Sequence, residues 1–438
     1  MNVYRYRSCD ARNKEDLKDS VIYFANLSEL NDPMEGFIDI YFKGDHVIWR
    51  NLFRNYIRSL FHEYLRQYST LEFTGDIYIP QWHDIFFQRI SKSDWFYELP
   101  SRFLKEDRIS SLIDFLQGKE IQKDELFIYL RIIHIIAVRN VMVYAKECKL
   151  VDEIPEPIFA DVFPDTKIDW NIFLGETKEK LVMKIISDCL SDTILLKELP
   201  SNVKRLALDF TSLFINKLEE LIYPNFYTAS FSLDPNNSSM WGNYADSHKG
   251  ICSIFKDDKE LPVSNRNEAE DRWPRYNFHN VEYKNDIVSI NFFENIANVS
   301  MLIWDQIWGS DYETKERSTI KPVDDNNRDK YWETRYKTIN RKTQDWEYER
   351  ETRLLLTSFL KDFSNPESRK LKYDFNYLIG IIFGMRTSDA DKREIIEIIS
   401  QKCKATNRKE FKFFQSYYNK TKVGMDFKEI KALSINEV

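Results

Sequence analysis

The sequence predicts an α+β fold, in which both ends of the chain form a mixed or antiparallel split sheet and a large all-helical insertion lies between them. Strand-type patterns occupy the beginning of the chain, helical-period patterns follow, and strand-type patterns return after Pro224. We therefore expect three segments: residues 1–43 as the N-terminal strands of the α+β core, 44–223 as the helical insertion domain, and 224–438 as the main part of the core.

The N-terminal segment reads as strands and turns. Tyrosines alternate with arginines in "VYRYR", so Tyr6 and Arg7 should point to opposite faces of a strand. "VIYFANLSELNDPMEGFIDIYF" then reads as a strand, a polar turn around residues 31–33 and a second strand, because Asn and Asp before Pro favour a turn. This segment is part of a sheet and not a complete domain.

The middle segment reads as helices. "HVIWRNLFRNYIRSLFHEYLRQY" repeats apolar pairs at the helical period, with arginines between them. Similar patterns run through "DELFIYLRIIHIIAVRNVMVY", "KEKLVMKIISDCLSDTILLKEL" and "VKRLALDFTSLFINKLEELIY". A connector containing several prolines, "EIPEPIFADVFPD", divides the segment. No repeat of fixed period is present, so a solenoid is not expected.

The C-terminal segment alternates strands with helical pieces. Strand signals are "FYTASFSL", "GICSIF", "HNVEYKND", "RETRLLLTSFL" and "YLIGIIFG", and helical signals are "DIVSINFFENIANVSMLIWDQIW" and "DADKREIIEIISQKC". The short stretch "SSMWGNYADSHKG" reads as a helix that a serine caps and Gly250 stops. On its shared face we expect Trp241 to be the core anchor, and Tyr244 and His248 to contact a ligand.

Composition narrows the function classes. The net charge of -7 gives no general attraction to nucleic acid, although a local basic groove would still permit such a partner. The 11 glycines form neither a dinucleotide-binding nor a P-loop fingerprint. The five cysteines are scattered and the six histidines make no ligand spacing, so we expect reduced thiols in the cytoplasm and no zinc site.

The most apolar stretch, "IIHIIAV", lies between Arg131 and Arg139. It is much shorter than the roughly 20 apolar residues that cross a bilayer. We therefore expect a buried stripe of a helix, and no membrane partner.

Five motifs together resemble one bacterial family. They are "IYFANLSELNDPME", "ASFSLDPNNSSMWGNYADSHKGIC", "VEY", "WEYERETRL" and "IGIIFGMRTS". Their order and content are similar to the family catalogued as domain of unknown function 2971. Leu30 and Met34 stand where that family usually has phenylalanine. The family name assigns no activity, but the occurrence of its members beside phage-defence and mobile elements implies a toxin or effector role in anti-phage defence.

A second, more distant similarity concerns the layout of polar residues. The layout consists, in chain order, of Arg7, Ser230 and Ser232 of "SFS", and Glu349 and Glu351. It resembles the Arg, Ser-x-Ser, Glu-x-Glu order of ADP-ribosyltransferases, whose split sheet binds NAD without a glycine fingerprint. The resemblance implies NAD as substrate, with Glu351 beside the ribose, Arg7 on the diphosphate and a strand serine at the nicotinamide pocket.

Neighbouring residues would complete this site. Strand alternation places Arg353 on the same face as Glu351, where the structural alternative is an ion pair on a solvated strand face. Tyr23, Asp32 and Glu35 would line the pocket, with Glu35 the more reactive of the two carboxylates, although residues 31–33 also suit a simple turn.

Two other functions remain open on sequence. Asp271 with Glu282 and Lys284 resembles the array of a metal-dependent nuclease. An aromatic groove around Trp241 and Tyr244 would instead suit a non-catalytic module that binds peptide or nucleotide. In each case the helical insertion would recognise an acceptor macromolecule, a trigger or a partner protein.

Overall fold

The structure is a computed structural model that describes residues 2–68, 77, 79, 94–150, 168, 170–173, 205–256, 259–264, 273–297, 301–324, 326–357 and 363–433. Helices and mixed or antiparallel sheets form an α+β fold, as the sequence predicts. The chain divides into two compact units. The sheet unit comprises residues 1–37, 225–287 and 334–438, and the helical unit comprises 38–224 and 288–333. The sequence-based division differs chiefly in assigning residues 288–333 to the core.

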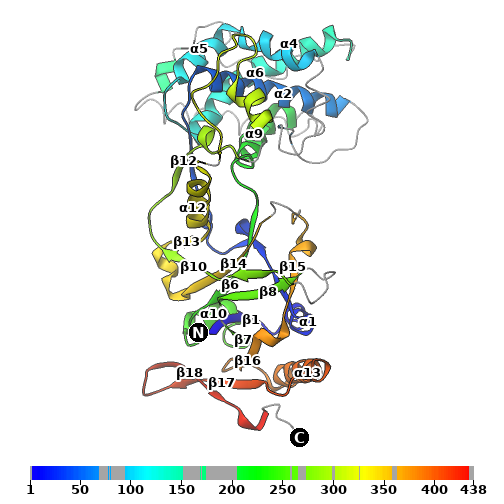
Figure 1. Cartoon of the computed structure of the whole chain (residues 1–438), viewed down its shortest axis with the longest axis vertical. Coiled ribbons are helices and arrows are strands. Elements are labelled where there is room, and N and C mark those ends of the chain that lie inside the picture. Colours follow the sequence, from blue (N-terminus) through cyan, green and yellow to red (C-terminus); the bar gives the residue numbers. More distant parts are fainter. Residues whose placement is uncertain are drawn as a thin grey trace. The chain divides into compact units, whose positions relative to one another are not determined.

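The main sheet of the sheet unit combines strands from both ends of the chain (Figure 1). Within the described residues its strand order is β10-β14-β6-β1-β7-β16-β17-β18, with a further strand, β3, on β6. The strands are β10 (His279–Asn280), β14 (Glu351–Thr357), β6 (Phe226–Ser232), β1 (Asn2–Arg7), β7 (Ile251–Lys256), β16 (Leu378–Phe383), β17 (Lys412–Asn419), β18 (Gly424–Glu429) and β3 (Ala25–Asn26).

The sheet is split beside β1. β1 pairs with β7 over its whole length, but its described pairing with β6 is limited to Tyr4 opposite Ser232. Further along β6 the neighbour is β3, with Ala25 opposite Thr228. The two strands therefore separate after Tyr4, and this separation makes room for the cavity described below.

Smaller elements surround the main sheet. A second sheet has the order β2-β15-β8-β9, and β11 pairs in parallel with β13. These strands are β2 (Val21–Tyr23), β15 (Lys370–Tyr373), β8 (Glu260–Ser264), β9 (Arg275–Asn277), β11 (Glu282–Tyr283) and β13 (Arg341–Lys342).

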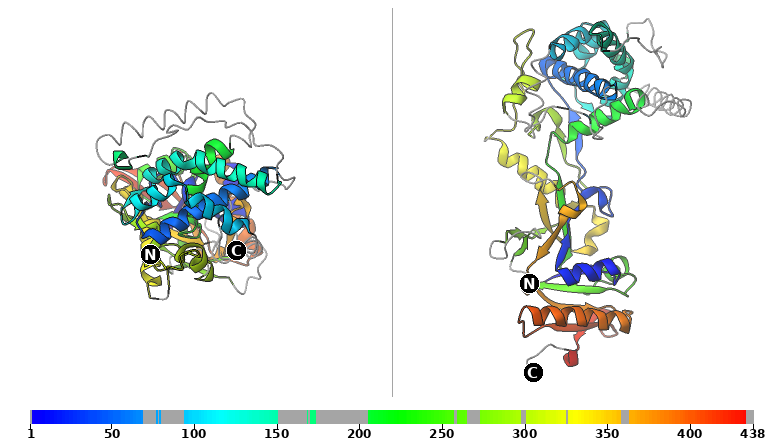
Figure 2. Two further views of the ribbon diagram at one scale, coloured as in Figure 1. Left: turned by 90° about the horizontal axis from the view of Figure 1, so that it is seen from above. Right: turned by 90° about the vertical axis from the view of Figure 1, so that its right-hand side faces the viewer.

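Helices pack against the outer strands of the main sheet. α13 (Asp389–Ala405) covers β16 and β17 and buries Ile395 and Ile399 in their core (Figure 2). α1 (Ala11–Asp19) lies beside it and is joined by the ion pair of Lys14 with Asp391. Sequence patterns predicted α13 but read the α1 stretch as strands and turns, because α1 carries a single fully buried residue and has no apolar stripe.

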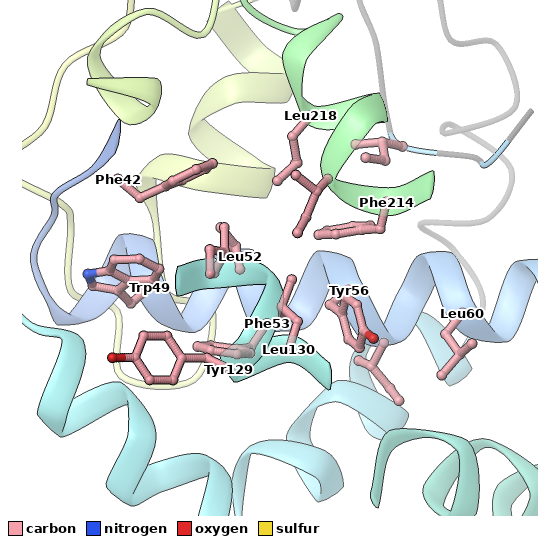
Figure 3. Packing of buried hydrophobic residues seen from close by; sticks show 14 of the residues in the cluster. Phe42, Trp49, Leu52, Phe53, Tyr56, Leu60, Tyr129, Leu130, Phe214 and Leu218 are labelled. Carbon is pink, nitrogen blue, oxygen red and sulfur yellow. The ribbon is translucent and has the colours of Figure 1, made fainter. Parts of the chain in front are cut away.

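The helical unit confirms three of the four helical patterns. Its described helices include α2 (His46–Tyr68), α4 (Trp95–Leu104), α5 (Asp107–Leu116), α6 (Lys123–Glu147) and α9 (Phe210–Glu219), which follows the π-helical turn Arg205–Asp209. Aromatic and aliphatic side chains of α2 interdigitate with those of α6 and α9 (Figure 3). The fourth pattern, residues 178–199, and the connector at 153–165 lie outside the described residues.

One predicted helix is wrong. Residues 286–308 read as a helical stretch, yet their described part contains the strand β12 (Ser289–Asn291), a 3₁₀ turn at Phe292–Glu294, a short helix, α11 (Met301–Trp304), and a π-helical turn. β12 pairs with β4 (Asp39–Phe42), which also pairs with β5 (Ile121–Gln122). Tertiary pairing with β4 overrides the local helical pattern.

The length and apolar composition of α6 raise the question of whether this helix could span a membrane. By length and composition it is apolar enough to cross a membrane, unlike the short stretch considered from sequence alone. Half of its most apolar window is buried inside the molecule, where Leu130 and Ile133 join the helical core. A core helix passes the same test, so α6 by itself is weak evidence for a membrane span.

Candidate functional site

A cavity of about 410 Å³ opens at the split in the main sheet. Strand residues that border it come from β1, β6, β13 and the start of β14. The wall also includes α10 (Ser238–Tyr244), the chain between Tyr23 and Glu35, and the end of the 3₁₀ turn Gln344–Glu349. This volume lies in the range of small-molecule sites. The lining residues include Arg5, Arg7, Tyr23, Glu35, Ser230, Ser232, Tyr244, Lys342, Glu349 and Glu351.

Lys342 lies at the centre of a buried charge cluster on the cavity wall. Its ammonium nitrogen is 2.9 Å from Glu35, 2.6 Å from Glu349 and 2.9 Å from Glu351. The lysine side chain is only 4% exposed, so these contacts are shielded from solvent. Two nearby carboxylates and Glu35, from the distant N-terminal segment, thus converge on one cation, and they raise the pKa of Lys342 despite its burial.

Arg353 is the second cation of the cluster. Its Nε and Nη2 donate to the two oxygens of Glu351 at 2.7 and 2.8 Å, and Nη2 also donates to Glu35. Burial alone would raise the pKa of Glu351, but Arg353 and Lys342 outweigh it and hold the pKa at about 2. Glu351 is therefore an ionised, firmly held carboxylate. The sequence-based alternative of a Glu351–Arg353 pair is present, but it is buried and not solvated.

Glu35 behaves differently from Glu351. Burial is the largest influence and raises its pKa, although Arg353 and Lys342 act against it. The nearby charge of Glu351 raises that pKa further. Glu35 therefore accepts a proton more readily than an exposed glutamate.

Glu349 reaches the cluster from outside the strand. Sequence alternation placed it on one strand face with Glu351, but Glu349 ends the 3₁₀ turn Gln344–Glu349. Arg350 then takes a left-handed conformation, with φ of 44°, before β14 begins. This turn brings Glu349 back toward Lys342, and the Tyr244 hydroxyl donates to Glu349 at 2.5 Å.

Two hydroxyl groups of β6 at the cavity form hydrogen bonds, and a third has no hydrogen-bond partner in the described structure. Ser232 donates to the Glu349 backbone oxygen at 2.7 Å, so it holds the 3₁₀ turn against β6. A hydrogen bond from Ser230 helps to lower the pKa of Glu351. Thr228, which sequence reasoning missed, is fully buried and has no hydrogen-bond partner for its Oγ1 in the described structure.

The arginines of β1 border the cavity from the other sheet face. Tyr4 lies opposite Ser232, and side chains directly opposite each other share a face, so strand alternation places Arg5 and Arg7 with Phe231. The Arg5 guanidinium accordingly lies 5.4 Å from the Phe231 ring centroid. Because β1 leaves β6 after Tyr4, both arginines still border the cavity. Burial lowers the pKa of both guanidinium groups.

α10 has the expected anchor but a different cap. Asn237, not a serine, accepts hydrogen bonds from the backbone at the helix start. Trp241 is completely buried, donates to the Pro235 oxygen and meets Tyr6 edge-on. Tyr244 lines the cavity, whereas His248 stacks on Trp241 and is absent from the lining.

The turn after α10 has left-handed backbone conformations at Asp246, Ser247 and His248. The sequence predicted a left-handed residue at Gly250, and this prediction is wrong. Gly250 is needed for a different reason. A Cβ there would lie 2.1 Å from the backbone oxygen of Arg7, so only glycine permits this close approach to β1.

Two further predicted site residues have structural partners. Asp32 accepts a hydrogen bond from the Met34 backbone at 2.9 Å, which is the turn that its sequence context suggests, and it does not line the cavity. Tyr23 lines the cavity and its hydroxyl donates to Glu29. Of these two, only Tyr23 is placed to meet a ligand.

The structure describes two of the three nuclease candidates. Glu282 and Lys284 are exposed and pair with each other at 2.7 Å, and Asp271 lies outside the described residues. In the part of the chain that the structure describes, no group of three or more His, Cys, Asp or Glu residues is arranged to hold a metal ion.

Comparison with known proteins supports the family resemblance. A family model described as "Protein of unknown function (DUF2971)" matches residues 240–354. These residues make up a DUF2971 region. The match spans the stretch from α10 to Leu354 and so includes Tyr244, Lys342 and Glu351. No curated protein and no solved structure matches the chain.

Sequence reasoning missed the residue that organises the charge cluster. Lys342 stands in "NRKTQDW", which has no recognisable motif, and its three partners become neighbours only in the folded sheet unit. A local signal existed in the spacing of Lys342 and Glu349, on either side of a short polar turn. Thr228 gave no signal, because an unpaired hydroxyl cannot be recognised from sequence.

Proposed function

We propose that this chain is an NAD-using enzyme of the ADP-ribosyltransferase type, which transfers ADP-ribose or hydrolyses NAD. The observation that carries the proposal is the order of neighbouring strands β14, β6 and β1. It brings the Glu-x-Glu, Ser-x-Ser and arginine elements to one cavity of about 410 Å³. The absence of glycine fingerprints from the sequence agrees with a split-sheet nucleotide site.

In this reaction the bond between the ribose and the nicotinamide nitrogen breaks, and nicotinamide leaves with the bonding electrons. The ribose acquires oxocarbenium character, which nearby carboxylates stabilise. An acceptor or water then forms a bond to the ribose and loses a proton. Glu351 is held as an anion for this purpose, and Glu349 is the second carboxylate on the cavity wall.

Other residues bind and orient the substrate. Arg5 and Arg7 carry positive charge at the β1 side of the cavity, where they would attract the diphosphate. Ser230 would orient the nicotinamide end, since Ser232 is already bonded to the Glu349 backbone. Tyr244, held by Glu349 and Asn31, would position the ring beside the reacting bond.

The biological setting is part of the proposal. The helical unit would hold the acceptor macromolecule, a trigger or a partner protein, and the enzyme would act in the cytoplasm as a toxin or effector of anti-phage defence. The family match gives no activity, so this setting rests on the resemblance alone.

A second candidate is a non-catalytic module that binds a nucleotide. The observation that favours it is the ion pairing of Glu351 with both Arg353 and Lys342, which also stabilises the fold. In that case the cavity binds its ligand and leaves it unchanged.

Nicotinamide release from NAD separates these functions. The purified protein should release nicotinamide, and Glu351→Gln and Glu349→Gln should each reduce release by about 100-fold or more while remaining folded at the assay temperature, as judged by circular dichroism. Glu282→Gln, an exposed glutamate of the same unit, is the matched control and should be as active as the wild type. NAD binding without release would support the binding module, and undiminished release in both glutamine variants would refute the catalytic roles.

A further inference from the structure

The buried cluster beside the cavity contains more negative than positive charge. Glu35, Glu349 and Glu351 face Lys342 and Arg353, and all five residues are buried. When every group is ionised, three carboxylates stand against two cations. Among the described residues, the phenols of Tyr244, Tyr283 and Tyr348 also face the cluster, and burial raises the pKa of all three, so they are neutral.

An uncompensated buried charge is unfavourable, because the interior cannot solvate it as water does. In the empty site a proton on Glu35 removes the imbalance, in keeping with the raised pKa of this residue. A ligand that carries one positive charge would remove it equally well. Either a proton on Glu35 or a ligand with one positive charge therefore neutralises the excess negative charge of the cluster.

A second observation points to an occupant at the same place. Thr228 is only 1% exposed and lines the cavity, yet its Oγ1 lacks a hydrogen-bond partner in the described structure. Strand alternation puts Thr228 on the same face of β6 as Ser230 and Ser232. Buried hydroxyl groups are normally bonded, so this one is available to a polar group of a ligand.

Aromatic rings also border the cavity. Tyr4, Tyr6, Tyr23 and Tyr244 contribute to its wall. Tyrosine rings attract a planar cation through their electron-rich faces, and they stack on planar rings of either charge. At the cluster the lining thus combines excess negative charge, an unpaired hydroxyl and aromatic surface, whereas Arg5 and Arg7 border the cavity on its β1 side.

We propose that the cavity recognises a planar ligand group bearing one positive charge, with the Glu35–Glu349–Glu351 cluster as counter-charge and Thr228 as polar contact. This inference rests on the proposed function in one respect: there the planar cation is the pyridinium ring of oxidised NAD. The site then selects the charged ring over the neutral ring of the reduced dinucleotide. When nicotinamide departs as a neutral molecule, the positive charge passes to the ribose as oxocarbenium character, where the same carboxylates can stabilise it.

Calorimetric titration with charged and neutral rings of nearly the same shape tests the inference. The probes are 1-methylnicotinamide and its neutral 1,4-dihydro form, and oxidised and reduced NAD. We expect the oxidised member of each pair to bind roughly tenfold more tightly or better, as a charged contact in a buried site favours. Glu35→Gln should abolish most of this preference, and Glu349→Gln provides a second test if the first variant is unstable.

Each outcome has a distinct meaning. Equal binding of oxidised and reduced forms would overturn charge recognition and leave dinucleotide binding intact. Binding of 1-methylnicotinamide without binding of NAD would support charge recognition and overturn the proposed function, and binding of none of the probes would overturn both. The control Glu282→Gln should retain the full preference, and a preference that survives both cluster variants would show that the counter-charge lies elsewhere.

Discussion

Lys342 Nζ lies 2.6 Å from Glu349 Oε2, across a 3₁₀ turn that ends in the left-handed residue Arg350. The same ammonium group contacts Glu35 and Glu351, so one side chain joins the N-terminal segment, the turn and β14. Its contacts locate the site more sharply than any single sequence motif does. They also make the cluster accessible to stability measurements that need no ligand.

Replacing Lys342 should be strongly destabilising. Lys342→Met leaves three buried carboxylates against Arg353 alone, and removal of one partner from a buried ion pair costs about 3–5 kcal/mol. Urea unfolding measures the change. Adding Glu35→Gln should recover part of the loss, whereas Lys284→Met, on an exposed lysine, should have little effect. Additive effects of the two cluster substitutions would contradict the coupling.

Glu35→Gln should change the pH dependence of stability. A carboxyl whose pKa is raised by folding stabilises the protein at pH values below its unfolded pKa, and this stability is lost as the pH rises through the folded pKa. The glutamine variant should therefore be more stable relative to wild type at pH 8 than at pH 4. Melting temperatures across this range test the sign, and a relative stability that falls with pH would refute it.

Glu351 should show the opposite dependence. Its folded pKa of about 2 lies below the ordinary value of 4.5, so its contribution is present above that value and is lost as the pH falls toward 2. Glu351→Gln should cost stability at pH 7 and progressively less below about pH 4. Parallel unfolding curves at pH 7 and pH 3 would measure this. An equal cost at both values would contradict it.

Thr228→Val should leave the fold intact and weaken ligand binding. The substitution keeps the shape of the side chain but removes a buried hydroxyl that lacks a partner, so unfolding free energy should stay the same or rise. Affinity for 1-methylnicotinamide should fall. A clear loss of stability would mean that the hydroxyl has a structural bond in solution.

Gly250 and Gly242 should respond in opposite directions to alanine. At Gly250 the new Cβ would meet the Arg7 backbone oxygen and strain the β1–β7 ladder, whereas at Gly242, within α10, it meets nothing within 4 Å. Gly242→Ala should stabilise by up to about 1 kcal/mol through helix propensity. Thermal unfolding of the two variants side by side checks this, and a stable Gly250→Ala protein would contradict the close contact.

Sequence patterns predicted what depends on local periodicity. The helices at residues 46–68 and 389–405 and the strands around "SFS" and "ICSIF" follow from apolar spacing, and Trp241 follows from the amphipathic face of α10. Pairing between distant segments was less accessible. β12 joins β4 in place of a predicted helix, and the position of Glu349 depends on the φ of Arg350, which no periodicity encodes.

The residues of the site likewise divide into those that were identified from sequence and those that were missed. Ser230, Ser232, Glu349, Glu351 and Arg7 were identified from sequence, and all of them border the cavity. Lys342 and Thr228 were missed, because their importance lies in what surrounds them: three carboxylates in one case, and no polar partner in the other. Both conditions exist only after residues more than 100 positions apart have come together.

β1 lies between β6 and β7 in the main sheet, and this position has a consequence while the ribosome synthesises the chain. β1 is made well before its partners β6 and β7, which begin at residues 226 and 251. At roughly 5–20 residues per second, a ribosome needs about 10–45 s to make the intervening chain. During that time β1 exposes two unpaired edges and its apolar face, so a chaperone that binds the nascent β1 strand would protect it from aggregation until β6 and β7 are made.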